Sequence, residues 1–477
     1  MAEPLVQDSQ RPPSIFDRKP LQDFYKDVCE TYLADRRPWV VGYSGGKDST
    51  ATLQLVWNAL SELPRSQLTK PVYVISSDTY VETPVIVDHI DKNLAQINSA
   101  GKEQGLPFTA TKVVPELSDT FWVSLLGKGY PAPSTKFRWC TDRMKIQPAN
   151  KFILDRVTEF GEVVMVLGAR KGESNSRDQV LKNHEIQGTH LRRHRSLTGA
   201  FVYSPIEEFS TDDVWTYLLQ VKSPWGASNR RLVGMYRNAQ SGECPLVVDT
   251  TTPSCGNSRF GCWVCTVVEK DSSMESMVDN GEEWMQALLD FRNELASHHD
   301  PEVKRKLRQH KRRNGRVTKK DDGSLIPGPY KPEVRRDLLR KLIQTQEKIR
   351  REGPDPKVEL ISTLELQEIR RIWRTEEQDW EDSVPKIYRD VTGRELDSVT
   401  EDVTNFTIRD QELLFDIAKN HEIPGELVAK LLGVERELHG MSRRAGIFGK
   451  IDAIFREDWL NEDEIGKLYQ LDGKGTV

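Results

Sequence analysis

Short hydrophobic runs alternate with stretches of helical periodicity along the first half of the chain. The hydrophobic runs lie at residues 40–41, 71–79, 108–114, 163–167 and 201–206. Between them, apolar residues recur every three to four positions at residues 50–57 and 85–97 and in a segment that ends near residue 157. Because short apolar runs are typical of strands covered on both faces, the alternation predicts an α/β fold with a parallel sheet.

The second half of the chain has the pattern of helices and many charged residues. Helices are expected at residues 283–295, 332–351 and 364–380, and two short ones within 410–439; another precedes the first strand, at residues 21–34. These changes of pattern divide the chain into four regions. They are an N-terminal helical arm at 1–37, a sheet domain at 38–240, a cysteine-rich segment at 241–275 and a charged helical region at 276–477.

A glycine pair directly follows the first predicted strand. The segment reads Ser44-Gly45-Gly46-Lys47-Asp48-Ser49 and leads into the helix expected at 50–57. Glycines let the backbone turn sharply and approach a ligand, and a helix N-terminus attracts anions with its free amides. The segment therefore predicts a phosphate-binding loop, although its spacing is not that of the G-x-x-x-x-G-K-[ST] loop. A plain surface turn is the alternative interpretation.

An acidic residue ends the second predicted strand. Asp78 is the next-to-last residue of the run at 71–79. In parallel sheets, ligands bind beyond the carboxyl ends of the strands. We therefore expect Asp78 and Ser44 to face one crevice.

Composition is that of an ordinary water-soluble protein. The 477 residues are 30% charged and 37% hydrophobic, and the net charge is −5. This balance does not by itself indicate nucleic-acid binding. No apolar signal region begins the sequence and no run is long enough to cross a bilayer, so a cytoplasmic protein without a membrane partner is expected.

One basic stretch departs from this overall balance. Residues 304–320 contain ten lysines and arginines and no acidic residue. Most charge runs are solvated loops, which is the alternative here. In an acidic chain, so concentrated a block also suits the phosphate backbone of a nucleic acid.

Most of the six cysteines gather in one region of the chain. Cys255, Cys262 and Cys265 have the spacing C-x6-C-x2-C, which lets neighbouring thiolates reach one metal centre. A fourth ligand must come from Cys244 or from Cys140. Structural zinc and an iron–sulfur cluster both remain open from the spacing alone.

Several motifs together resemble the phosphoadenylylsulfate-reductase branch of the PP-loop ATP pyrophosphatases. They are the Ser44–Ser49 loop, Asp78-Thr79 with Glu82-Thr83, Trp139-Cys140-Thr141, the G-x-R-x-x-E-S-x-x-R pattern from Gly168 to Arg177, and Pro205-Ile206 before Asp213-Val214-Trp215. The resemblance implies a doubly wound sheet that binds an adenine nucleotide. It implies that the sheet domain is a PP-loop nucleotide-binding domain in which ATP is held by Ser44, Gly45, Gly46, Lys47, Asp48, Ser49, Asp78 and Gly168.

Together with the R-F-G-C-W-x-C-T sequence around the last two cysteines, these motifs resemble the DndC-type sulfurtransferases of bacterial DNA phosphorothioation. This resemblance implies ATP and Mg²⁺, adenylation of a DNA backbone phosphate with release of pyrophosphate, and replacement of a non-bridging oxygen by sulfur. The residues implied at the reaction centre are Lys47, Asp48, Lys145, Arg170 and Arg177. The implied ligands of a [4Fe–4S] cluster are Cys140, Cys255, Cys262 and Cys265. Implied partners are DNA, a cysteine desulfurase as sulfur donor and other proteins of the system.

Two alternative functions are consistent with part of the same sequence pattern. A phosphoadenylylsulfate-type reductase would share the sheet, but its nucleophile is a cysteine in a C-terminal tail, and no cysteine follows Cys265. A nucleotide-sensing metal-cluster module without catalysis would explain the charged helical region. It gives no reason for Asp48, Asp78 and Arg170 to gather at strand ends.

Overall fold

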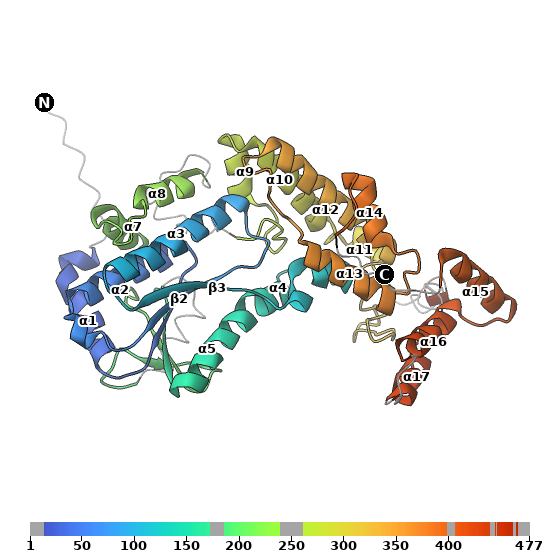
Figure 1. Ribbon diagram of the computed structural model, residues 1–477, viewed down its shortest axis with the longest axis horizontal. Helices are drawn as coiled ribbons and strands as arrows, with labels where there is room; N and C mark the ends of the chain where they lie inside the picture. The colour runs from blue at the N-terminus through green and yellow to red at the C-terminus, as the bar shows by residue number, and fades with distance from the viewer. Residues whose placement is uncertain are drawn as a thin grey trace, which may run out of the picture. The chain divides into compact units, whose positions relative to one another are not determined.

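The computed structural model describes residues 14–171, 186–238, 261–397, 406–438, 444, 446–460 and 464–465 (Figure 1). The chain forms two compact units. The sheet unit is made of the described parts of residues 1–115, 141–262 and 272–281, and the helical unit of residues 116–140, 263–271 and 282–477. Each unit is considered by itself.

A six-stranded sheet forms the centre of the sheet unit. Its strands are β1 (Trp39–Gly42), β2 (Val72–Ser77), β3 (Phe108–Val113), β4 (Val163–Val166), β5 (Arg192–Arg193) and β6 (Ala200–Tyr203). The order is β3-β2-β1-β4-β6-β5, and all pairs are parallel except β5 with β6. The predicted α/β fold with a mostly parallel sheet is therefore confirmed.

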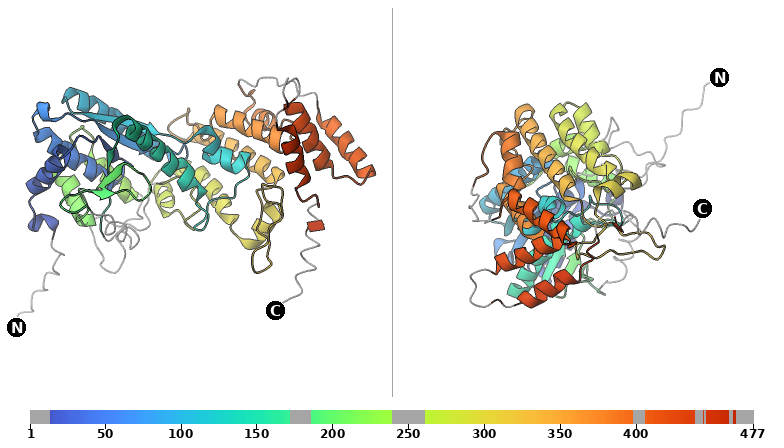
Figure 2. Two further views of the ribbon diagram at one scale, coloured as in Figure 1. Left: turned by 90° about the horizontal axis from the view of Figure 1, so that it is seen from below. Right: turned by 90° about the vertical axis from the view of Figure 1, so that its right-hand side faces the viewer.

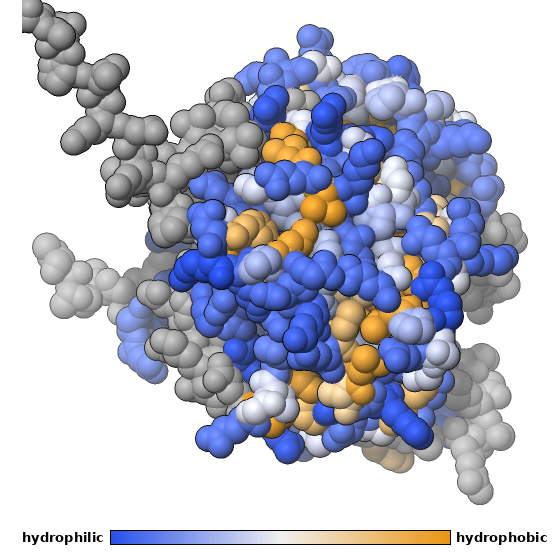
Figure 3. All heavy atoms as spheres, turned by 90° about the vertical axis from the view of Figure 1, so that its left-hand side faces the viewer, coloured by the Kyte–Doolittle hydropathy of each residue, from blue (hydrophilic) through white to orange (hydrophobic). Residues whose placement is uncertain are grey.

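Helices cover both faces of this sheet. Five of those on one face are α1 (Leu21–Leu33), α2 (Lys47–Glu62), α3 (Pro84–Glu103), α7 (Thr211–Gln220) and α8 (Asn229–Asn238). Helix α5 (Gln147–Phe160) covers the other face, as Figure 1 shows for β2 and β3. Successive residues of β1 point to opposite faces of the sheet. Trp39 and Val41 pack in the core on the face covered by α2 and α3, and Val40 packs in the core on the face covered by α5. The face of the molecule drawn in Figure 3 is mostly hydrophilic, with hydrophobic areas between the polar ones.

Short elements complete the sheet unit and its connections. They are η1 (Ile15–Asp17), η2 (Arg65–Gln67), α4 (Trp139–Thr141), the π-helical turn η5 (Asp142–Ile146) and α9 (Ser272–Asp279). Helix α7 begins with a capping box, in which Ser210 and Asp213 satisfy each other's backbone amides. The sequence Ser210-Thr211-Asp212-Asp213 is itself typical of a helix start, so this cap agrees with the pattern.

The helical unit packs its helices around large aromatic side chains. Its elements are η3 (Leu117–Asp119), η4 (Val123–Gly127), η6 (Glu283–Met285), α10 (Gln286–Ser297), α11 (Pro301–Leu307), α12 (Pro332–Glu352), α13 (Thr363–Glu376), α14 (Ser383–Thr392), α15 (Ile408–Asn420), α16 (Gly425–Glu437) and α17 (Ile447–Phe455). Trp122, Trp263 and Phe291 are buried against one another. Figure 2 shows these helices from two further directions.

The predicted helices correspond closely to the observed ones, with one difference of kind. The apolar spacing also predicts a short helix at residues 119–126, where the structure has a 3-10 turn at Leu117–Asp119 and a π-helical turn at Val123–Gly127. A buried side chain fixes this segment, because Trp122 Nε1 donates a hydrogen bond to the carbonyl of Leu360 over 2.5 Å. Within the described residues, no helix is long and apolar enough to cross a membrane.

Candidate functional site

The loop after β1 has the geometry that the glycine pair predicts. Gly45 has a φ of +72°, a conformation that favours glycine, and a Cβ there would lie 3.1 Å from Ile90. Helix α2 begins immediately afterwards, with Gly46 as its N-cap and no side-chain hydrogen bond capping it. The Lys47 amide donates to the Tyr236 hydroxyl, and the later amides of this first turn, which the N-cap residue does not bond, can face an anion.

Two serine hydroxyls close the loop on itself. The Ser44 amide donates to Ser49 Oγ over 3.2 Å, and the two hydroxyl oxygens lie 3.1 Å apart. Ser49 Oγ also donates to the Gly46 carbonyl over 3.1 Å. These bonds hold the loop in shape without a ligand.

Asp48 holds two buried cations at the start of α2. Its Oδ2 accepts from Lys47 Nζ over 2.9 Å, and its Oδ1 accepts from Arg170 Nε over 2.8 Å. Lys47 and Arg170 are each 7% exposed, and Arg170 also donates to the Phe209 carbonyl. The Asp48 carboxylate thus fixes two cations beside the loop, where their positive charge can attract an anionic ligand.

Gly168 brings the segment after β4 against this group. A Cβ on Gly168 would lie 2.9 Å from the carbonyl carbon and oxygen of Asp48. Only glycine permits this approach without displacing the backbone of α2. The structure thus gives Gly168 a packing role beside Asp48, in addition to the nucleotide contact expected from the sequence.

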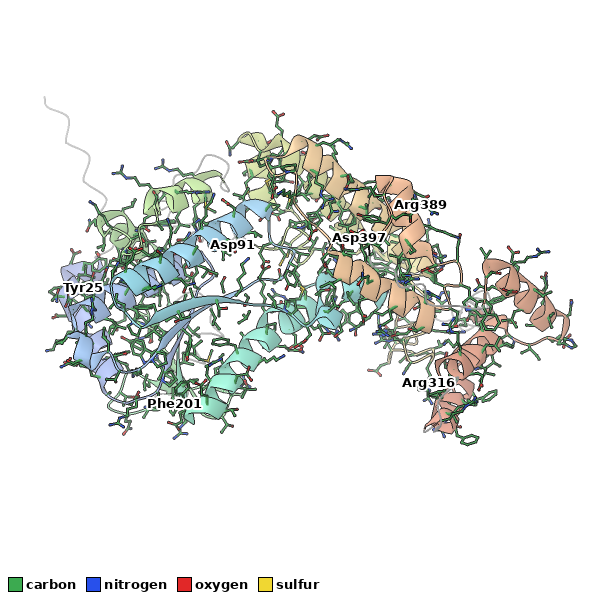
Figure 4. The ribbon with its side chains drawn as sticks, viewed as in Figure 1. Tyr25, Asp91, Phe201, Arg316, Arg389 and Asp397 are labelled. Atoms are coloured by element: carbon green, nitrogen blue, oxygen red, sulfur yellow. The ribbon has the colours of Figure 1, made fainter. Side chains whose placement is uncertain are left out.

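Asp78 lies at the end of the neighbouring strand. Strands β1 and β2 run parallel, and the Tyr43 amide donates to the Ile75 carbonyl over 2.8 Å, so Ser44 and Asp78 leave the sheet at the same edge. Asp78 accepts from Lys112 Nζ over 2.9 Å, and Lys112 also pairs with Asp91 of α3, which is labelled in Figure 4. Lys112 is a charged neighbour that the motifs did not indicate.

The turn after Asp78 holds a cysteine at this edge. Cys262 Sγ lies 3.4 Å from Thr79 Oγ1, and an antiparallel bridge pairs Cys262 with Glu82. Thr79 donates both its amide and its hydroxyl to Glu82 Oε2, over 2.9 and 2.6 Å. Lys145 Nζ lies 3.9 Å from Glu82. Burial raises the pKa of the Glu82 carboxyl, and Lys145 and the Thr79 hydrogen bonds partly oppose this rise.

The three described cysteines among the expected cluster ligands are all thiols outside disulfides. Cys140, Cys262 and Cys265 are half-buried. Cys265 is fixed through its carbonyl, which accepts from the buried Arg292 over 2.8 Å; Arg292 also donates to the carbonyls of Val268 and Glu269. This donor set is of the thiolate type that zinc and iron–sulfur clusters use. In the part of the chain that the structure describes, no three His, Cys, Asp or Glu side chains are grouped to hold a metal ion.

Three expected site residues lie outside the described residues. They are Arg177, Cys244 and Cys255. Two residues near the loop and its neighbouring turn had no specific role predicted from the sequence. Tyr236 of α8 accepts the Lys47 amide over 3.2 Å, and Thr79 links Cys262 to Glu82. Thr79 stands in a recognised motif, whereas no pattern in the sequence marks Tyr236.

The basic stretch at 304–320 belongs to the helical unit and is only partly exposed. It starts in α11 and continues through residues paired by antiparallel bridges. Arg308 donates to the carbonyls of Gly328 and Pro327, and burial lowers its pKa to about 10. Arg313 pairs with Glu376. The exposed cations include Arg305, Lys306, Arg312, Lys320 and Arg316, the last labelled in Figure 4.

One protein-family model matches the part of the chain that contains the site. Residues 38–268 match the sequence model of the phosphoadenosine phosphosulfate reductase domain. An uncharacterized protein of Methanocaldococcus jannaschii is 26% identical over 242 residues, which are 51% of this chain and 39% of that protein. This chain therefore spans less than half the length of that relative.

The solved structures that match this chain have low sequence identity and low TM-scores. A phosphoadenylyl-sulfate reductase from Candida auris with phosphate is 14% identical and covers 45% of this chain and 91% of its own, with a TM-score of 0.29. The U34-tRNA thiolase NcsA of Methanococcus maripaludis with its [4Fe-4S] cluster is 15% identical and covers 46% and 72%, with a TM-score of 0.28. An FMN adenylyltransferase of Candida glabrata with FAD and pyrophosphate is 15% identical and covers 45% and 61%, with a TM-score of 0.27.

Proposed function

Because residues 38–268 match a phosphoadenosine phosphosulfate reductase domain and include the whole phosphate loop, we propose that this chain is an ATP pyrophosphatase that activates DNA for sulfur transfer. It adenylates a phosphate of the DNA backbone, and sulfur then replaces one non-bridging oxygen. This is the reaction class of the DndC-type sulfurtransferases that the sequence resembles.

One observation carries the proposal: a cysteine thiol lies at the sheet edge that carries the phosphate loop. Ser44 and Asp78 leave adjacent parallel strands, and Thr79, directly after Asp78, contacts Cys262 Sγ at 3.4 Å. An enzyme that joins nucleotide activation to sulfur delivery needs these two functions at one edge. A reductase with its nucleophile in a distant tail does not need Cys262 there.

The loop supplies the groups that adenylation requires. A phosphate oxygen of DNA attacks the α-phosphorus of ATP, and pyrophosphate leaves. Negative charge grows on the departing pyrophosphate, where the α2 N-terminus and the cations Lys47 and Arg170 can stabilise it. Mg²⁺ that accompanies ATP would neutralise part of the same charge. Lys145 and Arg177 complete the proposed set of cations.

Sulfur transfer follows without net oxidation or reduction. Sulfur at the oxidation level of sulfide attacks the adenylated phosphorus of DNA, and AMP leaves with the oxygen that belonged to DNA. A [4Fe–4S] cluster held by Cys140, Cys255, Cys262 and Cys265 would present sulfur to this reaction. A cysteine desulfurase is the source of that sulfur, and a thiol reductant supplies the two electrons that convert its persulfide sulfur to sulfide before the transfer. Thr79 and Glu82 orient the Cys262 segment.

Product analysis on DNA tests the proposal. Purified chain is incubated anaerobically with ATP, DNA and desulfurase-generated sulfide, and phosphorothioate linkages are counted by mass spectrometry after nuclease digestion. We expect linkages only when ATP is present. Asp48→Asn should abolish them, whereas Glu62→Gln, at the exposed far end of α2, should leave them unchanged. Sulfite released from phosphoadenylylsulfate, with no phosphorothioate formed, would instead establish the reductase alternative.

DNA binding through the basic stretch has its own test. Replacing Lys306, Arg312 and Arg316 together by Gln should weaken DNA binding. It should also flatten the slope of log affinity against log salt concentration by up to about 0.9 for each DNA phosphate that the variant no longer neutralises. The charge-matched control replaces the exposed Lys348, Arg351 and Lys357 by Gln. Equally weakened binding in both variants would show that only net charge matters and would reject a specific footprint.

A further inference from the structure

An exposed aromatic ring lies in a tight turn of the helical unit, three residues before Cys140. The Phe137 amide donates to the Ser134 carbonyl over 3.0 Å, and the Ser134 amide donates to the Phe137 carbonyl over 3.2 Å. These two bonds fix the backbone of the turn, and the Phe137 ring is 48% exposed. A single exposed apolar residue is common in proteins, so the surroundings of this ring decide whether it has a role.

The ring is the outer end of a row of four aromatic side chains within the same unit. Phe121 stacks on Trp139 with 5.3 Å between ring centroids, Trp139 meets Tyr130 edge-to-face at 5.6 Å, and Tyr130 meets Phe137 at 6.5 Å. Trp139 is buried, and its Nε1 donates to the Pro131 carbonyl over 2.9 Å. The row therefore runs from the core to the surface and supports the Phe137 ring from within the unit.

Positive charge flanks the exposed ring. Lys136 and Arg138 are both exposed, and among the described residues neither has an acidic side-chain partner. The basic stretch at 304–320 reaches the same row, because the Arg313 guanidinium lies 5.5 Å from the centroid of the Tyr130 ring and donates to its hydroxyl over 3.4 Å. Glu376 pairs with Arg313 at 3.0 Å, so Lys136 and Arg138 carry the charge that is left for a ligand.

An aromatic face between cations matches the chemistry of a nucleic-acid strand. A base stacks on an aromatic ring, and the phosphates beside it pair with lysine or arginine. In a fully paired duplex the faces of the bases are covered by their neighbours, so only an unpaired base can stack on Phe137. A protein partner fits less well, because the cores of protein interfaces are depleted of charged residues and this ring has one on each side in the sequence.

We propose that Phe137 stacks on an unpaired base of the DNA and that Lys136 and Arg138 bind the phosphates beside that base. The inference rests on the DNA substrate of the proposed function, and it adds that the strand is single or locally opened at this turn. Cys140, a proposed cluster ligand, is three residues away, so its Cα lies at most about 11 Å from that of Phe137. The phosphate next to the stacked base would thus be held by the segment that carries this ligand.

Fluorescence anisotropy of the full chain, without ATP or sulfide, tests this role with two DNA probes. One is a labelled single strand, and the other is a duplex of the same sequence closed at both ends. Phe137→Leu removes the aromatic face and keeps an apolar side chain. We expect it to bind the single strand about fivefold to a hundredfold more weakly than the wild type and the closed duplex equally well. Phe137→Trp should keep the wild-type affinity for the single strand.

The matched control is Phe160→Leu. Phe160 is the last residue of α5 in the sheet unit and is 41% exposed, so the same chemical change is made at a comparably exposed ring. This variant should bind both probes as the wild type does.

Salt dependence separates stacking from charge. Phe137→Leu loses no phosphate contact, so its slope of log affinity against log salt concentration should equal that of the wild type. Replacing Lys136 and Arg138 together by Gln should flatten the slope on the single strand by up to about 1.4, or about 0.7 for each phosphate no longer neutralised.

Three results would overturn the assignment. The first is a wild type that does not bind the single strand, or a Phe137→Leu variant that binds it with unchanged affinity. The second is an equal loss of affinity for the single strand and the closed duplex in Phe137→Leu. The third is a loss in Phe160→Leu as large as that in Phe137→Leu.

Failure of the proposed function gives a different result. A chain that needs Phe137 to bind the single strand but forms no phosphorothioate would keep this site and lose the proposed reaction. A chain that forms phosphorothioate, with wild-type yield and single-strand affinity in Phe137→Leu, would keep the reaction and lose this site.

Discussion

Asp48 is the residue on which the charge arrangement of the phosphate loop depends. It is the shared counterion of Lys47 and Arg170, two cations that are almost fully buried. The motif predicted that Asp48 and Arg170 belong to one site. Their ion pair could not be predicted, because it joins residues 122 positions apart through the packing of the loop after β4 against α2.

Replacing Asp48 by Asn should lower both stability and ATP turnover. The change leaves two buried cations without their carboxylate, which costs about 2–4 kcal/mol in the free energy of unfolding. Urea unfolding of the variant measures this loss. Glu30→Gln removes one partner of the exposed Lys26–Glu30 pair and should change stability by less than about 0.5 kcal/mol. Similar values for both variants would refute the buried triad.

Gly168 should tolerate no side chain. In Gly168→Ala the new Cβ would lie 2.9 Å from the Asp48 backbone, so the start of α2 must shift at a cost of about 1–3 kcal/mol. We expect ATP cleavage to fall with stability. Gly234→Ala is the matched control, because nothing lies within 4 Å of its Cβ position and alanine favours a helix. Wild-type turnover in Gly168→Ala would contradict the close packing.

At the scale of elements, hydrophobic periodicity located the strands and most helices. Residues 332–351 were expected as a helix and form α12 at Pro332–Glu352, and the two helices around Ile423-Pro424 are α15 and α16. The π-helical turn at Val123–Gly127 could not be predicted, because apolar spacing does not separate i→i+4 from i→i+5 hydrogen bonds. Helix α14, which carries Arg389 in Figure 4, was not predicted, although Val384, Ile387 and Val391 follow helical spacing.

The segment that carries Cys265 depends on one helix residue, Arg292 of α10. Its guanidinium donates to three carbonyls between residues 265 and 269, and it is 1% exposed. Arg292→Lys cannot reach all three carbonyls and should cost about 2–4 kcal/mol. It should also speed the reaction of Cys265 with a thiol reagent. Arg351→Lys, at the exposed end of α12, should change neither quantity; unchanged thiol reactivity in Arg292→Lys would exclude this positioning role.

At the scale of the whole molecule, each unit should lose stability in mild acid. Burial lowers the pKa of His89 in the sheet unit and of His298 in the helical unit. Below pH about 6.5 the unfolded chain binds protons that these folded imidazoles do not, so the free energy of unfolding falls as pH falls. The loss between pH 7.5 and pH 5.5 should be at most about 1.4 kcal/mol per histidine.

Denaturant unfolding at pH 7.5 and 5.5 checks this sign. His298→Gln should reduce the pH dependence of the helical unit, and His89→Gln that of the sheet unit. A pH dependence of stability that neither His89→Gln nor His298→Gln changes would contradict the buried neutral imidazoles.

The central claim is that a DNA phosphate is adenylated before sulfur replaces its oxygen. The most direct measurement uses DNA labelled with ¹⁸O at its non-bridging phosphate oxygens, incubated with the chain, ATP and sulfide. Adenylation followed by displacement transfers one labelled oxygen to AMP, so mass spectrometry should find heavy AMP in equal amount to the phosphorothioate formed. Unlabelled AMP, or ADP with inorganic phosphate in its place, would contradict the account.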